Sequence, residues 1–257
     1  MSNSAGETGE VVHRAAFLAV AGCLALGSLV VAPAAAAQSG TFQVELNGKQ
    51  VGTASCNFVA TLNGYNSTSL VRVTTKGLDY SLSKSAQLSP ANELRQVMLS
   101  AVVNNEAVTV TGAPSAGQIL LEFSANGQKS TARLQAHTGA VFMPDLDPGA
   151  LETLLALAAE RNNRGLWAII PKHGGSIEPI VLATYADQQG VLDGKTVTVH
   201  HLVATIANSK MELFSGSNNQ LLQAELPQEG FTLVRKGFVR KPPARASAPS
   251  GQPVALR

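Results

Sequence analysis

The chain of 257 residues is long enough for one large domain or two small ones with a substantial buried core. A charged fraction of 14% and a net charge of +2 exclude a chain too highly charged to collapse. Aromatic residues make up only 5%, while Val, Thr, Ser, Gly and Asn recur, a mixture that favours pleated sheets joined by tight turns.

Residues 1–37 carry the pattern of a secretory signal peptide. Arg14 precedes an uncharged run over residues 15–31, Pro33 breaks that run, and residues 34–37 are all alanine. Signal peptidase requires such small side chains, so we expect cleavage after Ala37 and a periplasmic or secreted protein. Cys56 is then the only cysteine left, without an internal disulfide partner, and we expect it to be buried.

Two alternatives stay open for this segment. The apolar run approaches the roughly 20 residues that span a bilayer, so an uncleaved membrane anchor is one of them. The other is a lipoprotein acylated at Cys23, because residues 20–23 (Val-Ala-Gly-Cys) resemble a bacterial lipobox. Against the lipoprotein, the apolar run continues well past Cys23.

Residues 38–240 form the expected β-rich domain, which opens with a hairpin. Phe42, Val44 and Leu46 alternate with polar residues, and Asn47-Gly48 is a strong signal for a two-residue turn with positive φ. Further hairpin strands are expected at residues 51–59, 67–75, 78–83, 119–124 and 130–135.

Residues 93–103 fit two structures. Leu94, Val97, Met98 and Ala101 fall at helical spacing, yet Asn104-Asn105 followed by alternating valines favours a hairpin, and we slightly prefer a strand.

One helix is predicted, and the residues at its start indicate where it begins. Asp147 can cap it and Pro148 suits the first turn, while Leu151, Leu154, Leu155 and Ala158 form one apolar stripe. After the helix, strands are expected at residues 166–170, 180–185, 196–206, 211–214, 221–226 and 231–239.

The predicted fold is mainly β: a curved antiparallel sheet or half-barrel of hairpins, with one amphipathic helix packed on its concave face. Closure into a barrel and an ordinary helix-on-sheet core without a cavity are both compatible with the pattern. If the helix lies in the hollow of the sheet, the same apolar lining could admit a lipid-like ligand. The expected lining residues are Leu151, Leu154, Leu155 and Trp167.

Several short segments resemble uncharacterised exported bacterial proteins of the DUF3108 type. They are Gly40–Val44, Asn47–Gly52, Leu146–Pro148, Leu166–Pro171 and Gly230–Arg235. Those proteins are similar in outline to the outer-membrane lipoprotein carrier, whose curved antiparallel sheet surrounds a helix and holds lipid chains. The resemblance implies the same architecture and lipid handling, but it transfers no functional residue position by position.

No catalytic or metal site is expected. The ionisable candidates in the exported part are His137, His173, His200, His201, Asp145 and Asp147. His200 and His201 are neighbours on a predicted strand, so their side chains leave opposite faces. No Gly-flanked nucleophile, phosphate loop or paired-cysteine pattern appears, and no cofactor is predicted.

Residues 241–257 are basic and rich in proline, and we expect a disordered tail. Such a tail could contact an anionic membrane surface, although most are simply solvated ends. The chain is therefore interpreted as an exported cell-envelope binding or carrier protein for an apolar, lipid-like ligand, not an enzyme. The alternative is a structural or assembly protein of the envelope without a small-molecule ligand, and nucleic acid is not an expected partner.

Overall fold

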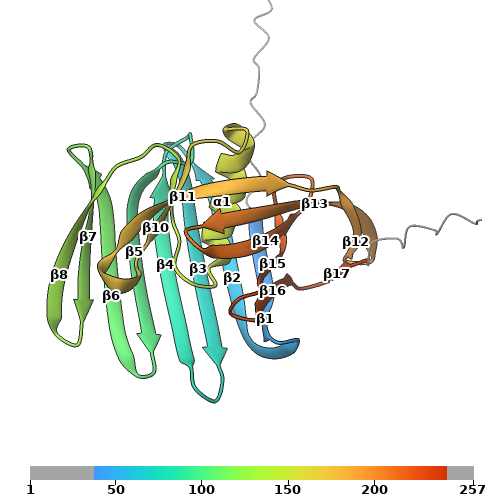
Figure 1. Cartoon of the computed structure of the whole chain (residues 1–257), viewed down its shortest axis with the longest axis horizontal. Helices are drawn as coiled ribbons and strands as arrows, with labels where there is room; N and C mark the ends of the chain where they lie inside the picture. Colours follow the sequence, from blue (N-terminus) through green and yellow to red (C-terminus); the bar gives the residue numbers. More distant parts are fainter. Residues whose placement is uncertain (1–37, 242–257) are drawn as a thin grey trace, which may run out of the picture. The chain divides into compact units, whose positions relative to one another are not determined.

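The computed structural model describes residues 38–241 (Figure 1). The predicted signal peptide and nearly all of the predicted tail lie outside the described residues. The described part contains seventeen strands, one α-helix and one short 3-10 helix, and it is mainly β as predicted. No helix within it is long and apolar enough to cross a membrane.

The first eight strands form an antiparallel meander in which each strand pairs with the next. Asn47 and Gly48 both have positive φ, as the first predicted hairpin requires, and so do Asn126 and Gly127. Residues 93–103, which fit helix or strand by sequence, form a strand. The strands are β1 (Gln38–Leu46), β2 (Lys49–Thr61), β3 (Gly64–Thr74), β4 (Asp79–Leu88), β5 (Leu94–Val103), β6 (Glu106–Ser115), β7 (Gln118–Ala125) and β8 (Gln128–Gln135).

The second half of the sheet is built mostly from shorter strands and is joined to the meander through β1, which pairs with both β2 and β16. From β16 the order continues through β15, β14, β13, β11 and β10 to β9, while β12 pairs with β13 and β17. The strands are β9 (Ala140–Phe142), β10 (Leu166–Ile170), β11 (Ser176–Thr184), β12 (Gln188–Leu192), β13 (Lys195–Ile206), β14 (Ser209–Ser215), β15 (Leu221–Leu226), β16 (Phe231–Arg235) and β17 (Phe238–Arg240).

One strand pair departs from the predicted antiparallel pairing. β9 and β10 run parallel, with Ala168 opposite Val141, and the helix α1 (Pro148–Glu160) connects them. Parallel neighbours need a crossover of a dozen or more residues, and the helix provides it. Because α1 is the connection within this β-α-β unit, the path of the chain places it on the inner face of the sheet.

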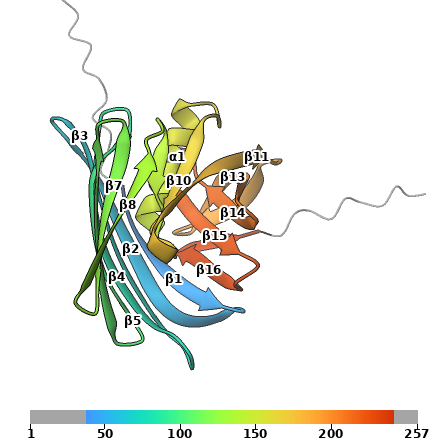
Figure 2. The ribbon, with the colours of Figure 1, turned by 60° about the vertical axis from the view of Figure 1, so that its left-hand side comes forward.

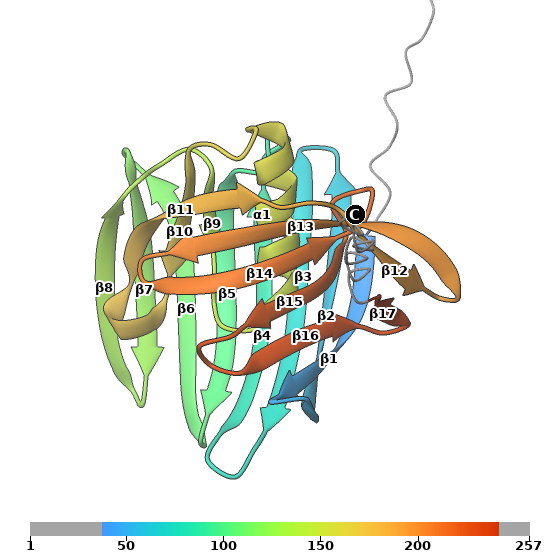
Figure 3. The same cartoon turned by 45° about the vertical axis from the view of Figure 1, so that its right-hand side comes forward.

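The sheet stays open and curves until its two halves face each other (Figure 2). The strands of the second half cross the long strands of the meander at a steep angle (Figure 3), as in orthogonal sheet packing. Helix α1 lies between the halves, against β2 and β3 on one side and against β9, β10 and β15 on the other. The predicted helix on the concave face of a curved sheet is therefore confirmed.

Three details differ from the sequence-based expectation. The predicted single apolar stripe underestimates how much of α1 is buried. Nearly the whole circumference of its first three turns is buried, including Glu152 and Thr153. The strand expected at residues 231–239 is two strands, because Gly237 makes a turn with φ of +83°. Strands β9 and β12 carry no two-residue alternation that would have predicted them.

Candidate functional site

The start of helix α1 is tied to the meander by a buried ion pair. The Asp147 carboxylate accepts hydrogen bonds from the backbone N–H groups of Gly149 (2.9 Å) and Ala150 (3.3 Å), which confirms the predicted cap. Its second oxygen pairs with the ammonium of Lys84 on β4, and both side chains are almost completely buried. The helix end is thus fixed to one position along β4.

A second buried ion pair holds the next turn of the helix to the other half of the sheet. Glu152 lies 3.4 Å from the guanidinium of Arg235 on β16. Arg235 also donates to the carbonyl oxygens of Leu221 (3.0 Å) and Ser39 (2.8 Å) and lies over the ring of Phe42. Burial raises the pKa of Glu152, and the positive charge of Arg235 only partly offsets that rise.

Small polar side chains complete the contact between α1 and the sheet. We call the buried polar residues of this contact the polar seam. Ser67 and Ser69 of β3 lie directly under Gly149, where a Cβ atom would overlap Ser69 Oγ. Ser69 Oγ and one oxygen of Glu152 are buried without a hydrogen-bond partner in the described part of the chain. The seam consists of Cys56, Ser67, Ser69, Lys84, Asp147, Glu152, Thr153 and Arg235.

Cys56 lies on β2 under the helix and is buried, as predicted. Burial raises the pKa of its thiol, and the negative charge of Glu152 raises it further. The thiol is therefore protonated at neutral pH and unreactive while the helix covers it.

An apolar hollow opens where the loop before α1 meets the β13–β14 and β15–β16 hairpins. Its volume is about 220 Å³, and we call it the mouth. The rim is charged, with Asp145 paired to Lys172 at 2.6 Å and with Lys210 and Glu229 beside them. The apolar wall consists of Met143, Leu146, Leu151, Ile170, Ile206, Met211 and Leu226.

The four predicted ligand-lining residues occupy three different environments. Leu151 lines the mouth, whereas Leu154 and Leu155 are buried in the core. Trp167 on β10 is half-buried and stacks on the ring of His137, with 3.7 Å between the ring centroids. Of the three predicted leucines, the structure thus brings only Leu151 to an opening.

Sequence reasoning found Asp147 as the helix cap but missed the other charged members of the seam, although a signal was present for two of them, Lys84 and Arg235. Lys84 lies on the same face of β4 as Leu82, Ala86 and Leu88, so the two-residue alternation of this strand predicts that the Lys84 side chain points inward. Arg235 likewise shares the inward face of β16 with Leu233. A charge at an inward position of an alternating strand is the signal that would have predicted a buried ion pair.

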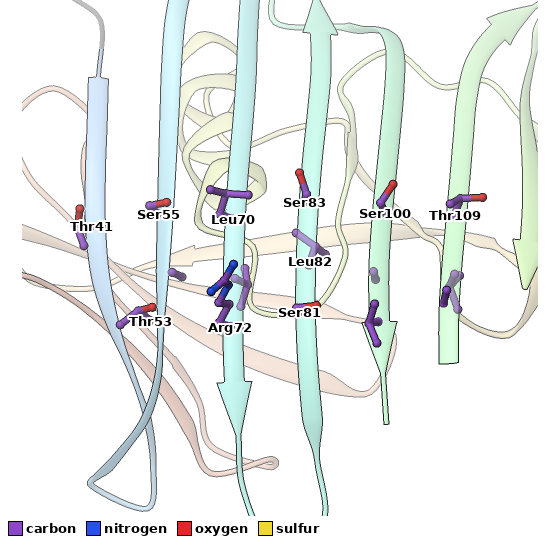
Figure 4. A pocket seen from close by; sticks show the side chains of 16 residues that line it. Thr41, Thr53, Ser55, Leu70, Arg72, Ser81, Leu82, Ser83, Ser100 and Thr109 are labelled. Atoms are coloured by element: carbon purple, nitrogen blue, oxygen red, sulfur yellow. The ribbon is translucent and has the colours of Figure 1, made fainter. Parts of the chain in front are cut away.

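A larger hollow lies on the opposite face of the meander, away from the helix (Figure 4). Its volume is about 730 Å³, and we call it the outer hollow. It crosses six strands, β1 to β6, on the face that points to solvent. The outward side chains that line it are Thr41, Thr53, Ser55, Leu70, Arg72, Ser81, Ser83, Ser100, Val102, Ala107 and Thr109.

The histidines of β13 point to different surroundings, as their adjacent positions require. His200 pairs with Asp187 at 2.9 Å, whereas His201 stacks on Phe214 and lies 3.3 Å from Glu212. Among residues 38–241, no three His, Cys, Asp or Glu side chains gather where they could share a metal ion.

No protein-family model, curated protein or solved structure matches this chain.

Proposed function

We propose that this chain is an exported cell-envelope protein that binds an apolar, lipid-like ligand between α1 and the sheet. The observation that carries the proposal is the mouth, an apolar hollow with a charged rim at the start of the helix. Apolar walls with a few polar groups at the opening are typical of sites for amphiphiles. The hydrocarbon end would contact Leu151, and the polar end would stay at the rim with Lys210.

The mouth alone is smaller than a complete site. Its volume of about 220 Å³ lies below the roughly 300–1,000 Å³ of common small-molecule pockets. A longer chain would have to enter the space that Leu154 and Leu155 now fill. The proposal therefore includes a shift of α1 when ligand binds.

The polar seam supports such a shift. A buried ion pair contributes little net stability, because the desolvation of both charges offsets most of their attraction. The side of α1 that faces β2, β3 and β4 is held by one such pair, Asp147 with Lys84, and by the serines of β3. Ser69 Oγ on this side has no hydrogen-bond partner in the described structure. This side can separate at a lower cost in free energy than an apolar contact of equal area.

A blocked mouth tests the ligand site. Ser209 is exposed at the start of β14 and lines the mouth, so Ser209→Trp should fill it without disturbing the core. A fluorescent fatty-acyl probe should bind the natural chain, and Ser209→Trp should weaken that binding at least tenfold. Ser217→Trp, exposed on the β14–β15 loop and outside the mouth, is the matched control. No probe binding by the natural chain, or equal binding by both variants, would refute the proposal.

Thiol labelling of Cys56 tests the helix shift. Because α1 covers this thiol, a saturating acyl probe that displaces the helix should accelerate its labelling severalfold. A Cys23→Ser background makes Cys56 the only cysteine in the chain. A labelling rate unchanged by bound probe would show that the ligand does not move the helix.

A further inference from the structure

The outer hollow is lined mainly by short side chains that carry hydroxyl groups. Seven of the eleven outward side chains that line it are Ser or Thr, and Arg72 is the only charged one. Long charged side chains stand instead on the neighbouring strands, as Glu122 on β7 and Lys129 and Arg133 on β8 do.

The hydroxyls of the outer hollow are available to a ligand. Just beyond it, Thr111 donates to Glu122 at 3.4 Å, whereas the seven hydroxyls inside have no protein partner in the described structure. Each is both a donor and an acceptor, so the group can match a ligand that carries many hydroxyls.

The register of the strands aligns several of these side chains in a row across the sheet, which we call the ladder. Thr41 pairs with Ser55, Ser55 with Leu70, and the row continues through Ser83, Ser100 and Thr109. Neighbouring strands are spaced by about 4.8 Å, so this row repeats its groups over about 24 Å. Figure 4 shows the labelled members of the row side by side on the face turned away from α1. A periodic row of this length fits an extended polymer better than a compact molecule.

Charge and apolar surface narrow the class of polymer. Arg72 has no ion-pair partner in residues 38–241, and the hollow contains no carboxylate. A free guanidinium binds carboxylates and similar anions through two parallel hydrogen bonds. Leu70 and Val102 are 59% and 38% exposed and offer a surface for the C–H faces of sugar rings.

We infer that the outer hollow is a binding site for an acidic polysaccharide that crosses strands β1 to β6. Its hydroxyls bind the Ser and Thr ladder, its sugar rings lie on Leu70 and Val102, and one of its anionic groups binds Arg72. This site lies on the other face of the sheet from the mouth and does not depend on the proposed lipid site.

The test uses the full exported chain and three polymers: polygalacturonate, neutral pullulan and poly-glutamate. Polygalacturonate should bind, and pullulan and poly-glutamate should each bind at least tenfold more weakly, because one lacks the charge and the other lacks the sugar hydroxyls. Binding should weaken as salt is added. Poly-glutamate binding equal to that of polygalacturonate would overturn the inference, as would no polygalacturonate binding at millimolar concentration.

Two variants locate the site. Arg72→Gln should reduce polygalacturonate affinity about tenfold, and Ser83→Trp should abolish binding because the indole would stand in the middle of the row. The matched controls are Arg133→Gln and Thr131→Trp, both exposed on β8 and outside the hollow. Controls that lose as much affinity as the two variants would place the site elsewhere. Ser209→Trp should leave polysaccharide binding unchanged, which separates this test from that of the lipid site.

Discussion

The two halves of the sheet are stabilised in different ways. Strands of the meander have one wet and one buried face, and β3 alternates almost perfectly between buried and exposed residues. Most strands of the second half are shorter, and β9 and the first four residues of β15 are buried on both faces. Polar and apolar residues alternate along a strand when one of its faces is exposed to water and the other is buried. This alternation is therefore clear in the first half and absent where a strand is covered on both faces.

The same contrast appears in how the halves hold helix α1. The meander presents Ser67, Ser69 and Lys84 to it, whereas the second half presents fully buried apolar side chains such as Leu221 and one charged residue, Arg235. Polar contacts fix the position of the helix along the sheet, and apolar contacts supply most of the stabilising free energy. Substitutions of the buried residues that hold the helix should therefore cost more stability than substitutions on the outer face of the meander.

The largest effect is expected from Arg235→Ala. This change leaves the Glu152 carboxylate buried without its positive partner and removes the donors to Leu221 and Ser39. Breaking a buried ion pair from one side costs about 3–5 kcal/mol, which urea unfolding would measure. Arg72→Ala, an exposed arginine on the outer face, should change the unfolding free energy by less than about 0.5 kcal/mol. Equal effects of the two substitutions would contradict the contrast between the faces.

Gly149→Ala should have the next largest effect. Alanine favours a helix over glycine by up to about 1 kcal/mol, but a Cβ here would overlap Ser69 Oγ and stand 2.9 Å from Ser67 Oγ. We expect a net loss of about 1–3 kcal/mol from overpacking in thermal or urea unfolding.

Ser69→Ala should relieve that overlap. Ser69 Oγ has no hydrogen-bond partner within the described residues, so its removal alone should be nearly neutral. In the double variant with Gly149→Ala, the loss should shrink by more than half. An additive double variant would mean that the seam relaxes in some other way.

How much of this could be predicted follows from the same contrast. The meander was predictable because each turn signal, such as Asn47-Gly48 or Asn126-Gly127, separates runs whose alternation marks one wet face. The helix start was predictable because Asp147 and Pro148 act locally. These features depend on a few neighbouring residues and on water.

What could not be predicted depends on distant partners. Glu152 appears as a solvated helix residue until Arg235, 83 positions away, is placed beside it. The parallel pairing of β9 with β10 depends on where the helix returns the chain, which three buried residues do not reveal. The wall of the mouth combines segments that are far apart in the sequence, from Met143 to Glu229, so the position of Leu151 in an opening was not predictable from its spacing.

The pH dependence of stability should sharpen the comparison further, with a smaller effect than the loss of Arg235. Burial raises the pKa of Glu152 in the folded protein above its value in the unfolded chain. Its contribution to stability is therefore complete below the unfolded pKa and is lost as pH rises through the folded pKa. Relative to Glu152→Gln, the natural chain should lose unfolding free energy across that window, measured by urea unfolding at several pH values. A parallel pH dependence of the two proteins would contradict the raised pKa.

The smallest effects come from a pair of serines on opposite faces of neighbouring strands. Ser67→Ala removes a buried hydroxyl that donates to the Gly149 carbonyl at 3.4 Å, and it should cost about 0.5–1.5 kcal/mol. Ser83→Ala removes an exposed hydroxyl of the outer hollow and should stay within about 0.5 kcal/mol. Ser83→Ala should instead weaken polygalacturonate binding, which Ser67→Ala should leave unchanged. Because each serine then affects one property only, a stability cost at Ser83 or a binding loss at Ser67 would show that the two faces of the sheet are coupled.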